Sequence, residues 1–256
     1  MTLDEETHIY RNSERPNMRF TSVTTVLEQY HEPFNEDFHA ARVAAKNGVT
    51  KEAVIAEWRA INKQANEYGT SIHQVMERFL LSPNKLYIPR DDFESLLIRK
   101  FQDVCHTNKL SLINSNTIRP EHIMFLDYTG FHLDPEQEAG LAGTSDIVED
   151  VDDDKFNVWD FKTNKKFDFE SSYNEWMKYP VNHLNYSKYT LYSLQISIYG
   201  VMYERETGRK FNRGGLFYWD RNAETWTLIP VIYMKRDAEI ILNHFKTSVF
   251  PKMLIR

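Results

Sequence analysis

The sequence contains a single cysteine, Cys105, and this excludes several kinds of structure. One thiol allows no intramolecular disulfide, and zinc or iron–sulfur sites built from cysteines need several thiols. Cys105 lies in a helical pattern, where we expect a small buried apolar side chain. The sequence therefore predicts a protein of a reducing compartment that holds no iron–sulfur cluster.

Long apolar runs are also missing. No stretch approaches the roughly 18–20 apolar residues that a membrane-spanning helix needs. The first 17 residues are polar and acidic, without the apolar region of a secretory signal. These absences predict a soluble, cytoplasmic protein.

Positive charge is not in excess either. The chain has 31 lysines and arginines against 37 acidic residues, which gives a formal net charge of −6. A nucleic-acid-binding protein usually has a basic surface, so this balance argues mildly against one. A basic groove can nevertheless coexist with acidic surroundings, and metal-binding carboxylates themselves add negative charge.

The apolar patterns predict the fold class. Hydrophobic residues make up 41% of the 256 residues, enough for a large core. Apolar spacing predicts helices at 22–31, 36–47, 51–68, 69–81, 91–107, 184–206 and 237–248. Strands are predicted at 121–127, 140–150, 155–163, 214–220 and 225–234. We expect an α/β fold whose central sheet is covered by helices on both faces. Residues 1–114 form a mainly helical N-terminal region, packed on and continuous with a core at 115–256.

The segment VWDFKTN at 158–164 gives the first indication of function. On a strand, Asp160 and Lys162 point to the same face. Asp146 lies on the preceding strand, so the two carboxylates can meet at one edge, where they repel unless a cation lies between them. Mg²⁺ and Mn²⁺ prefer such oxygen ligands. A lysine beside them can orient water or neutralise a phosphoryl group, which suits phosphodiester hydrolysis.

A structural reading of the same residues stays open. An acid-x-Lys triplet occurs by chance about once in a chain of this size. Indeed, Asp153-Asp154-Lys155 repeats it in a predicted turn. Under this reading Asp160 and Lys162 form an ordinary ion pair, and replacing both with apolar residues would be tolerated.

Two helical patterns add candidates. Gly69, His73 and Glu77 recur at every fourth residue, with His73 at the margin of an apolar face. Gln195 and Tyr199 lie one turn apart and can contact a phosphate or a base. Taken alone, each pattern is more often structural.

The order of these patterns is more specific than any one of them. G-x3-H-x3-E, G-T-S-D-I, W-D-F-K-T and Q-x3-Y together resemble the RecB-like branch of the PD-(D/E)XK nuclease superfamily. Within it, the chain is most similar to small phage-encoded exonucleases and to the mitochondrial genome maintenance exonuclease, over residues 69–203. Relatives with an iron–sulfur cluster use four cysteines, which this chain lacks.

The resemblance implies a central mixed β-sheet flanked by helices, with a restriction-endonuclease-like core. It also implies a DNA exonuclease that depends on Mg²⁺ or Mn²⁺. Its substrate would be DNA that is single-stranded or has a free end. It would act in recombination, repair or replication, alongside proteins of those processes, and in the host cytoplasm if a phage encodes it. A structure-specific endonuclease of the same fold and a non-catalytic DNA-binding subunit are the alternatives.

The resemblance also implies a metal site. His73, Asp146 and Asp160 would be metal ligands, together with the backbone carbonyl of Phe161. Glu121 falls where relatives often have an acid, and we expect a structural role for it.

The implied catalytic group overlaps with the metal site. It comprises Asp146, Asp160 and the catalytic lysine Lys162, with Gln195 and Tyr199 assisting.

In relatives the helical N-terminal region forms an arch or wall along a single strand. Here it offers Tyr30, Phe34, Trp58 and Tyr68, with Arg42, Lys46, Lys51 and Arg59 interspersed. Such residues can stack bases and hold phosphates, although each aromatic is more often part of a core.

Overall fold

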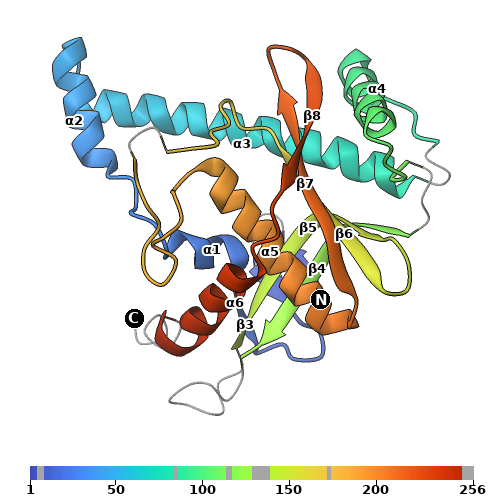
Figure 1. Cartoon of the computed structure of the whole chain (residues 1–256). Coiled ribbons are helices and arrows are strands. Elements are labelled where there is room, and N and C mark those ends of the chain that lie inside the picture. The colour runs from blue at the N-terminus through green and yellow to red at the C-terminus, as the bar shows by residue number, and fades with distance from the viewer. Residues whose placement is uncertain (5–8, 83–85, 114–116, 129–138, 172–173, 250–256) are drawn as a thin grey trace.

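The computed structural model describes the chain except for residues 5–8, 83–85, 114–116, 129–138, 172–173 and 250–256 (Figure 1). Among the described residues, no helix is both long enough and apolar enough to cross a membrane.

The N-terminal region contains three short strands that the sequence did not predict. Strands β1 (Thr2–Asp4) and β2 (Ile9–Arg11) pair with each other, and β3 (Arg19–Ser22) joins the central sheet. Each has three or four residues, too few for a recognisable alternation of apolar and polar positions. Helix α1 (Val23–Glu28) follows, and its N-terminus is capped by the Ser22 hydroxyl.

The next helices differ from the prediction at one place. Helix α2 (Glu36–Asn47) has the predicted bounds, and Gly48 caps its C-terminus. Helix α3 (Lys51–Leu81) is one continuous helix of 31 residues, so the predicted break near residue 69 is wrong. The hydroxyl of Ser71 donates to the carbonyl of Tyr68 inside the helix, so the chain stays helical through this position. Helix α4 (Asp92–Thr107) then packs against α3.

The central sheet is mixed, which confirms the predicted fold class. Its strand order is β3-β5-β6-β7-β8, with β4 paired to β5. The pairs β3–β5 and β6–β7 are parallel and the others are antiparallel. The main strands are β4 (Ile118–Asp127), β5 (Ala139–Asp150), β6 (Lys155–Lys162), β7 (Lys210–Asp220) and β8 (Thr225–Val231).

Helices cover both faces of this sheet (Figure 1). On one face, Val148 and Val158 pack in a core with α1, α5 (Lys188–Thr207) and α6 (Lys235–His244). On the other, Ile147 and Trp159 pack with α3 and α4. Because neighbouring strand residues point to opposite faces, β5 and β6 serve both cores. A π-helical turn at Phe245–Val249 follows α6.

Candidate active site

The sheet has a gap along one edge of β5. Strand β4 runs along the other edge, from Gly140 to Glu149. On the gapped edge, β3 pairs with residues 139–142 and β6 with residues 147–150. Residues 143–146 therefore have no strand partner on that side, and backbone groups and side chains can meet there. Asp146 lies at this gap.

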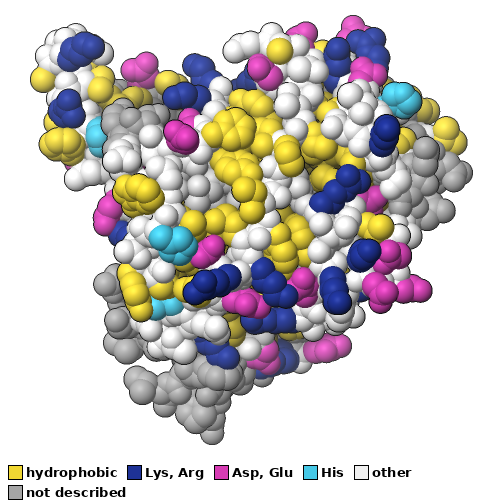
Figure 2. Space-filling view, viewed as in Figure 1, with side chains coloured by type: hydrophobic (Ala, Val, Ile, Leu, Met, Phe, Trp, Pro, Cys, Tyr) yellow, Lys and Arg dark blue, Asp and Glu magenta, His cyan; other side chains and the backbone are white. Residues whose placement is uncertain are grey.

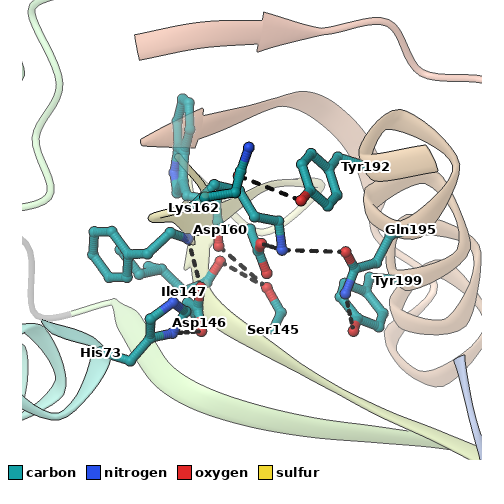
Figure 3. Close-up of polar contacts among 12 residues, drawn as sticks. His73, Ser145, Asp146, Ile147, Asp160, Lys162, Tyr192, Gln195 and Tyr199 are labelled. Carbon is teal, nitrogen blue, oxygen red and sulfur yellow. Dashed lines mark hydrogen bonds and ion pairs between the residues drawn. The ribbon is translucent and has the colours of Figure 1, made fainter. Parts of the chain in front are cut away.

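The carboxylate of Asp146 takes the place of a missing strand partner. Its Oδ2 accepts a hydrogen bond of 2.5 Å from the backbone N–H of Phe161 on β6. Its Oδ1 lies 3.1 Å from Nδ1 of His73 on α3 (Figure 3). Asp146 thus joins residues from β6 and from the helix that covers one face.

The predicted pair on β6 faces helix α5. Asp160 and Lys162 form an ion pair, and Lys162 Nζ also donates to Gln195 Oε1 at 3.3 Å. Gln195 Nε2 in turn donates to the Tyr199 hydroxyl at 2.9 Å. The ammonium lies 4.5 Å from the ring centre of Tyr192. The Lys162 ammonium is therefore in contact with groups on several sides, and the Lys162 side chain is only 16% exposed.

Glu121 belongs to this site, against our expectation of a structural role. The β4–β5 register places it opposite Asp146, and it is the one residue from Ile118 to Asp127 that lacks a ladder partner. Its φ of +47° is strained for a residue with a side chain. Ligand atoms of His73, Glu121 and Asp146 all lie within 4.8 Å of one another. Like charges directly opposite on neighbouring strands destabilise a sheet, so a structural role is not supported.

The pKa values show how crowded the negative charge is. Burial raises the pKa of Glu121 to about 8, and nearby Asp146 adds to the effect. Burial and Asp146 also raise the pKa of Asp160 to about 6, against the opposing effect of Lys162. Burial alone would raise the pKa of Asp146, but His73 outweighs it and the pKa is lowered.

The two basic groups respond to the same acids. Burial tends to lower the pKa of His73, but the charge and hydrogen bond of Asp146 raise it to about 9. Burial also tends to lower the pKa of Lys162, and Asp160 outweighs this effect. Three carboxyl groups thus share one lysine and one histidine. Such a cluster favours binding of a further cation.

Gly69 lets helix α3 come close to the end of β6. A Cβ at this position would lie 2.9 Å from Oγ1 of Thr163, the residue after Lys162. The glycine of the G-x3-H-x3-E pattern therefore has a packing reason, and it brings His73 to the gap.

Two cavities meet at this cluster. One, of about 690 Å³, extends from the gap towards β3, α1 and α5. The other, of about 640 Å³, extends along α3 towards the turn after β7. Leu3, His73 and Lys162 line both cavities, so β1, α3 and β6 border each of them.

The structure brings the predicted site residues together. The first cavity is lined by His73, Asp146, Asp160, Lys162, Gln195 and Tyr199, and the second by Phe161.

The N-terminal aromatics have different environments. Tyr30 is 1% exposed in a core and donates to the carbonyl of Ile241, so it cannot stack a base. Phe34 is 66% exposed and packs against Trp58. The Tyr68 hydroxyl accepts a hydrogen bond from Nε1 of Trp219.

The comparison with protein families agrees with this geometry. A model of the PD-(D/E)XK nuclease superfamily matches residues 49–247, most of the chain. The chain belongs to this superfamily. A search of curated proteins finds no match.

Solved structures similar to this superfamily member include SSO0001, with a TM-score of 0.41 and 13% identity over 98% of this chain and 81% of that chain. Another is a protein of Eubacterium rectale named "Putative exonuclease", with a TM-score of 0.43 and 13% identity over 99% of this chain and 86% of that chain.

PD-(D/E)XK nucleases use divalent metal ions, and the donor set here fits one. The imidazole of His73 and the carboxylates of Glu121 and Asp146 converge within 4.8 Å. The N–H and C=O groups of one strand residue point to the same side of the strand. The N–H of Phe161 points into the gap, where it donates to Asp146, so the Phe161 carbonyl also faces the gap. Glu121 is the ligand candidate that sequence reasoning missed, and Asp160 is held in the ion pair with Lys162.

Proposed function

We propose that the chain is a metal-dependent exonuclease that hydrolyses phosphodiester bonds of DNA from a free end. The observation that carries this proposal is the meeting of His73, Glu121 and Asp146 at the sheet gap, beside the Asp160–Lys162 pair. The reaction would serve recombination, repair or replication. We infer that residues 1–114 and 115–256 act as one nuclease domain, because β3 and α3 supply parts of the sheet and the site.

The acidic cluster would hold the metal. His73, Glu121 and Asp146 are the proposed ligands, with Asp160 and the Phe161 carbonyl completing the set. When bound, Mg²⁺ or Mn²⁺ lowers the pKa of water and stabilises negative charge on the phosphate. The raised pKa values of Glu121 and Asp160 reflect their shared negative charge and burial.

Lys162 would neutralise charge that develops on the phosphate during cleavage. Its ammonium is positioned by Asp160 and by the carbonyl oxygen of Gln195. Tyr199 fixes the orientation of the Gln195 amide, which places oxygen rather than nitrogen against the lysine. Burial raises the pKa of Tyr199 well above its ordinary value, so its hydroxyl stays neutral and can hydrogen-bond the substrate.

We propose that the DNA strand passes from one cavity to the other across the site. On the face in Figure 2, lysines and arginines are interspersed with acids. A strand would therefore be held by local contacts in the cavities rather than by a uniformly basic surface.

Digestion of end-labelled DNA tests the proposal. Single-stranded, duplex and closed circular DNA are incubated with Mg²⁺, Mn²⁺ or EDTA. We expect metal-dependent loss of both linear forms or one of them, and intact circles. Cleaved circles would instead indicate the endonuclease, and binding without cleavage the non-catalytic subunit.

The chain supplies its own matched control. Lys162→Ala should abolish cleavage, whereas Lys155→Ala, in the other acid-x-Lys triplet, should leave it unchanged. Lys155 is exposed at the start of β6. Equal activity of the two variants would reject the assigned role of Lys162.

A further inference from the structure

Arg221 lines the cavity of about 640 Å³ that runs along α3. It follows directly after β7, in the turn to β8. Its Nη2 donates to the backbone carbonyl of Thr163 at 3.3 Å, and Thr163 is the neighbour of Lys162. The guanidinium therefore lies beside the catalytic end of β6.

The guanidinium also stacks on an aromatic ring. It lies 3.7 Å from the ring centre of Tyr68 on α3. The Tyr68 hydroxyl accepts a hydrogen bond of 2.9 Å from Nε1 of Trp219, which is 1% exposed. An arginine stacked on a fixed ring keeps its planar fork in one orientation, which suits binding of a phosphate by two hydrogen bonds.

Among the described residues, the charge of Arg221 has no acidic partner at ion-pair distance. None of the ion pairs found among the described residues involves it. Its Nε is buried and makes no hydrogen bond in that part of the chain. A partly buried cation is costly unless an anion accompanies it. The wall of this cavity also offers hydrogen-bonding groups of Asn66, Thr70 and Asn164, and its acids are Glu77 and Glu121.

We propose that Arg221 binds a phosphate of the DNA strand next to the phosphate that is cleaved. This inference rests on the proposed function and extends it, because it assigns the cavity along α3 to the strand. The phosphate is either a terminal one or an internal phosphodiester, since both present negatively charged non-bridging oxygens to a guanidinium. Arg221 would be a positioning residue that sets where the strand stops relative to Lys162.

Binding measured in EDTA tests this proposal without cleavage. Fluorescence anisotropy gives Kd for a single-stranded oligonucleotide at several salt concentrations, for wild type, Arg221→Gln and Arg221→Lys. We expect Arg221→Gln to raise Kd about tenfold or more and to reduce the slope of log Kd against log salt by about 0.7, the value for one lost phosphate contact on a single strand. Arg221→Lys should keep the slope and give an intermediate Kd, because it keeps the charge and loses the fork.

Arg213→Gln is the matched control. Arg213 is an exposed arginine on β7 that stacks on Trp159 and lines neither cavity. Its substitution should leave the slope unchanged. An unchanged slope for Arg221→Gln, in protein whose circular dichroism and unfolding match wild type, would overturn the proposal. If Arg221→Gln fails to fold, a wild-type Kd for Arg221→Lys would overturn it equally.

Oligonucleotides with a 5′-phosphate, a 3′-phosphate or only hydroxyl ends separate the two sources. If the slopes of wild type and Arg221→Gln differ only for an oligonucleotide with one particular phosphorylated end, Arg221 binds that terminal phosphate. If the slopes differ for all three oligonucleotides, it binds an internal phosphate. The proposed function fails separately. Wild-type protein that binds with the Arg221-dependent slope but never cleaves would refute the nuclease and keep this contact.

Discussion

Strand β5 carries buried acids at two places, and their surroundings differ. Glu149, near its end, is 4% exposed. Its Oε1 accepts a hydrogen bond from Ser111, and its Oε2 accepts from Asn157 and from Nε1 of Trp159. All three donors are neutral, and they satisfy the carboxylate with hydrogen bonds of 2.7, 2.7 and 3.1 Å. Three residues earlier, Asp146 lies among other charges.

The surroundings of Asp146 are crowded with like charge. Glu121 lies opposite it in the register, and Asp160 raises the negative charge further. His73 and Lys162 offset only part of it. The comparison teaches that burial alone does not distinguish a proposed metal ligand from a structural acid. What distinguishes it is negative charge that the protein's own donors leave incompletely compensated.

The largest difference in cleavage rate should come from replacing Asp146 and Glu149, one at a time, with the amide of the same shape. Asp146→Asn should lower the cleavage rate by at least about 1000-fold, because it removes a charged ligand from the site. Its free energy of unfolding in EDTA should change by less than about 1 kcal/mol, since the amide still accepts the Phe161 N–H and repulsion from Glu121 disappears. Glu149→Gln should cleave like wild type. Similar rates for both variants would erase the distinction.

Truncation of Glu149 should lower stability and leave cleavage unchanged, the opposite of Asp146→Asn. Glu149→Ala leaves the buried donors of Asn157 and Trp159 unsatisfied, so we expect a loss of about 3 kcal/mol in urea unfolding. The remaining folded protein should cleave at the wild-type rate, measured per folded molecule. Loss of cleavage without loss of stability would place Glu149 in the site.

The pH dependence of stability should follow the crowded acids. The folded-state pKa values of Glu121 and Asp160, about 8 and about 6, exceed the unfolded values of about 4. The folded chain therefore binds more protons than the unfolded chain between about pH 4 and 8, and stability falls as pH rises through that window. His73, with a pKa of about 9, acts in the same direction above about pH 6.5.

Urea unfolding in EDTA between pH 5 and 9 measures this fall. Glu121→Gln should make it shallower. Saturating Mn²⁺ should also oppose it, because metal binds the deprotonated acids and stabilises the folded state more at high pH. Stability that rises with pH in the metal-free wild type would contradict the charge arrangement described for this site.

Much of the site could be predicted because its residues carry local patterns. His73 lies in a helical repeat, Asp160 and Lys162 alternate on a strand, and Gln195 and Tyr199 lie one turn apart. The central sheet follows from the change in apolar period after residue 114, and its mixed strand order is what the family resemblance implies; the structure and the family model agree with both. Local patterns therefore found the residues that each element presents to the gap.

What could not be predicted depends on contacts between distant segments. Glu121 meets Asp146 only through the register of β4 against β5, and its positive φ leaves no sequence signal. Helix α3 runs through Gly69 because packing against α4 and the sheet outweighs the weak helix propensity of glycine. Arg221 lies in a turn without a motif, and its position is set by Tyr68 and Thr163.

The smallest predicted effect concerns the backbone strain at Glu121, opposite Asp146. Glu121→Gln removes the charge and keeps the left-handed backbone, whereas Glu121→Gly removes both charge and strain. A side chain in this conformation costs roughly 1–2 kcal/mol, and the greater freedom of glycine in the unfolded chain offsets part of it. Glu121→Gly should therefore be more stable than Glu121→Gln by about 0.5–1 kcal/mol in urea unfolding with EDTA. Both variants should lose most of the stabilisation by Mn²⁺. A glycine variant that is less stable than the glutamine variant would show that the backbone at residue 121 is not strained. The surroundings of Asp146 and Glu149 would then differ only in the repulsion between Glu121 and Asp146.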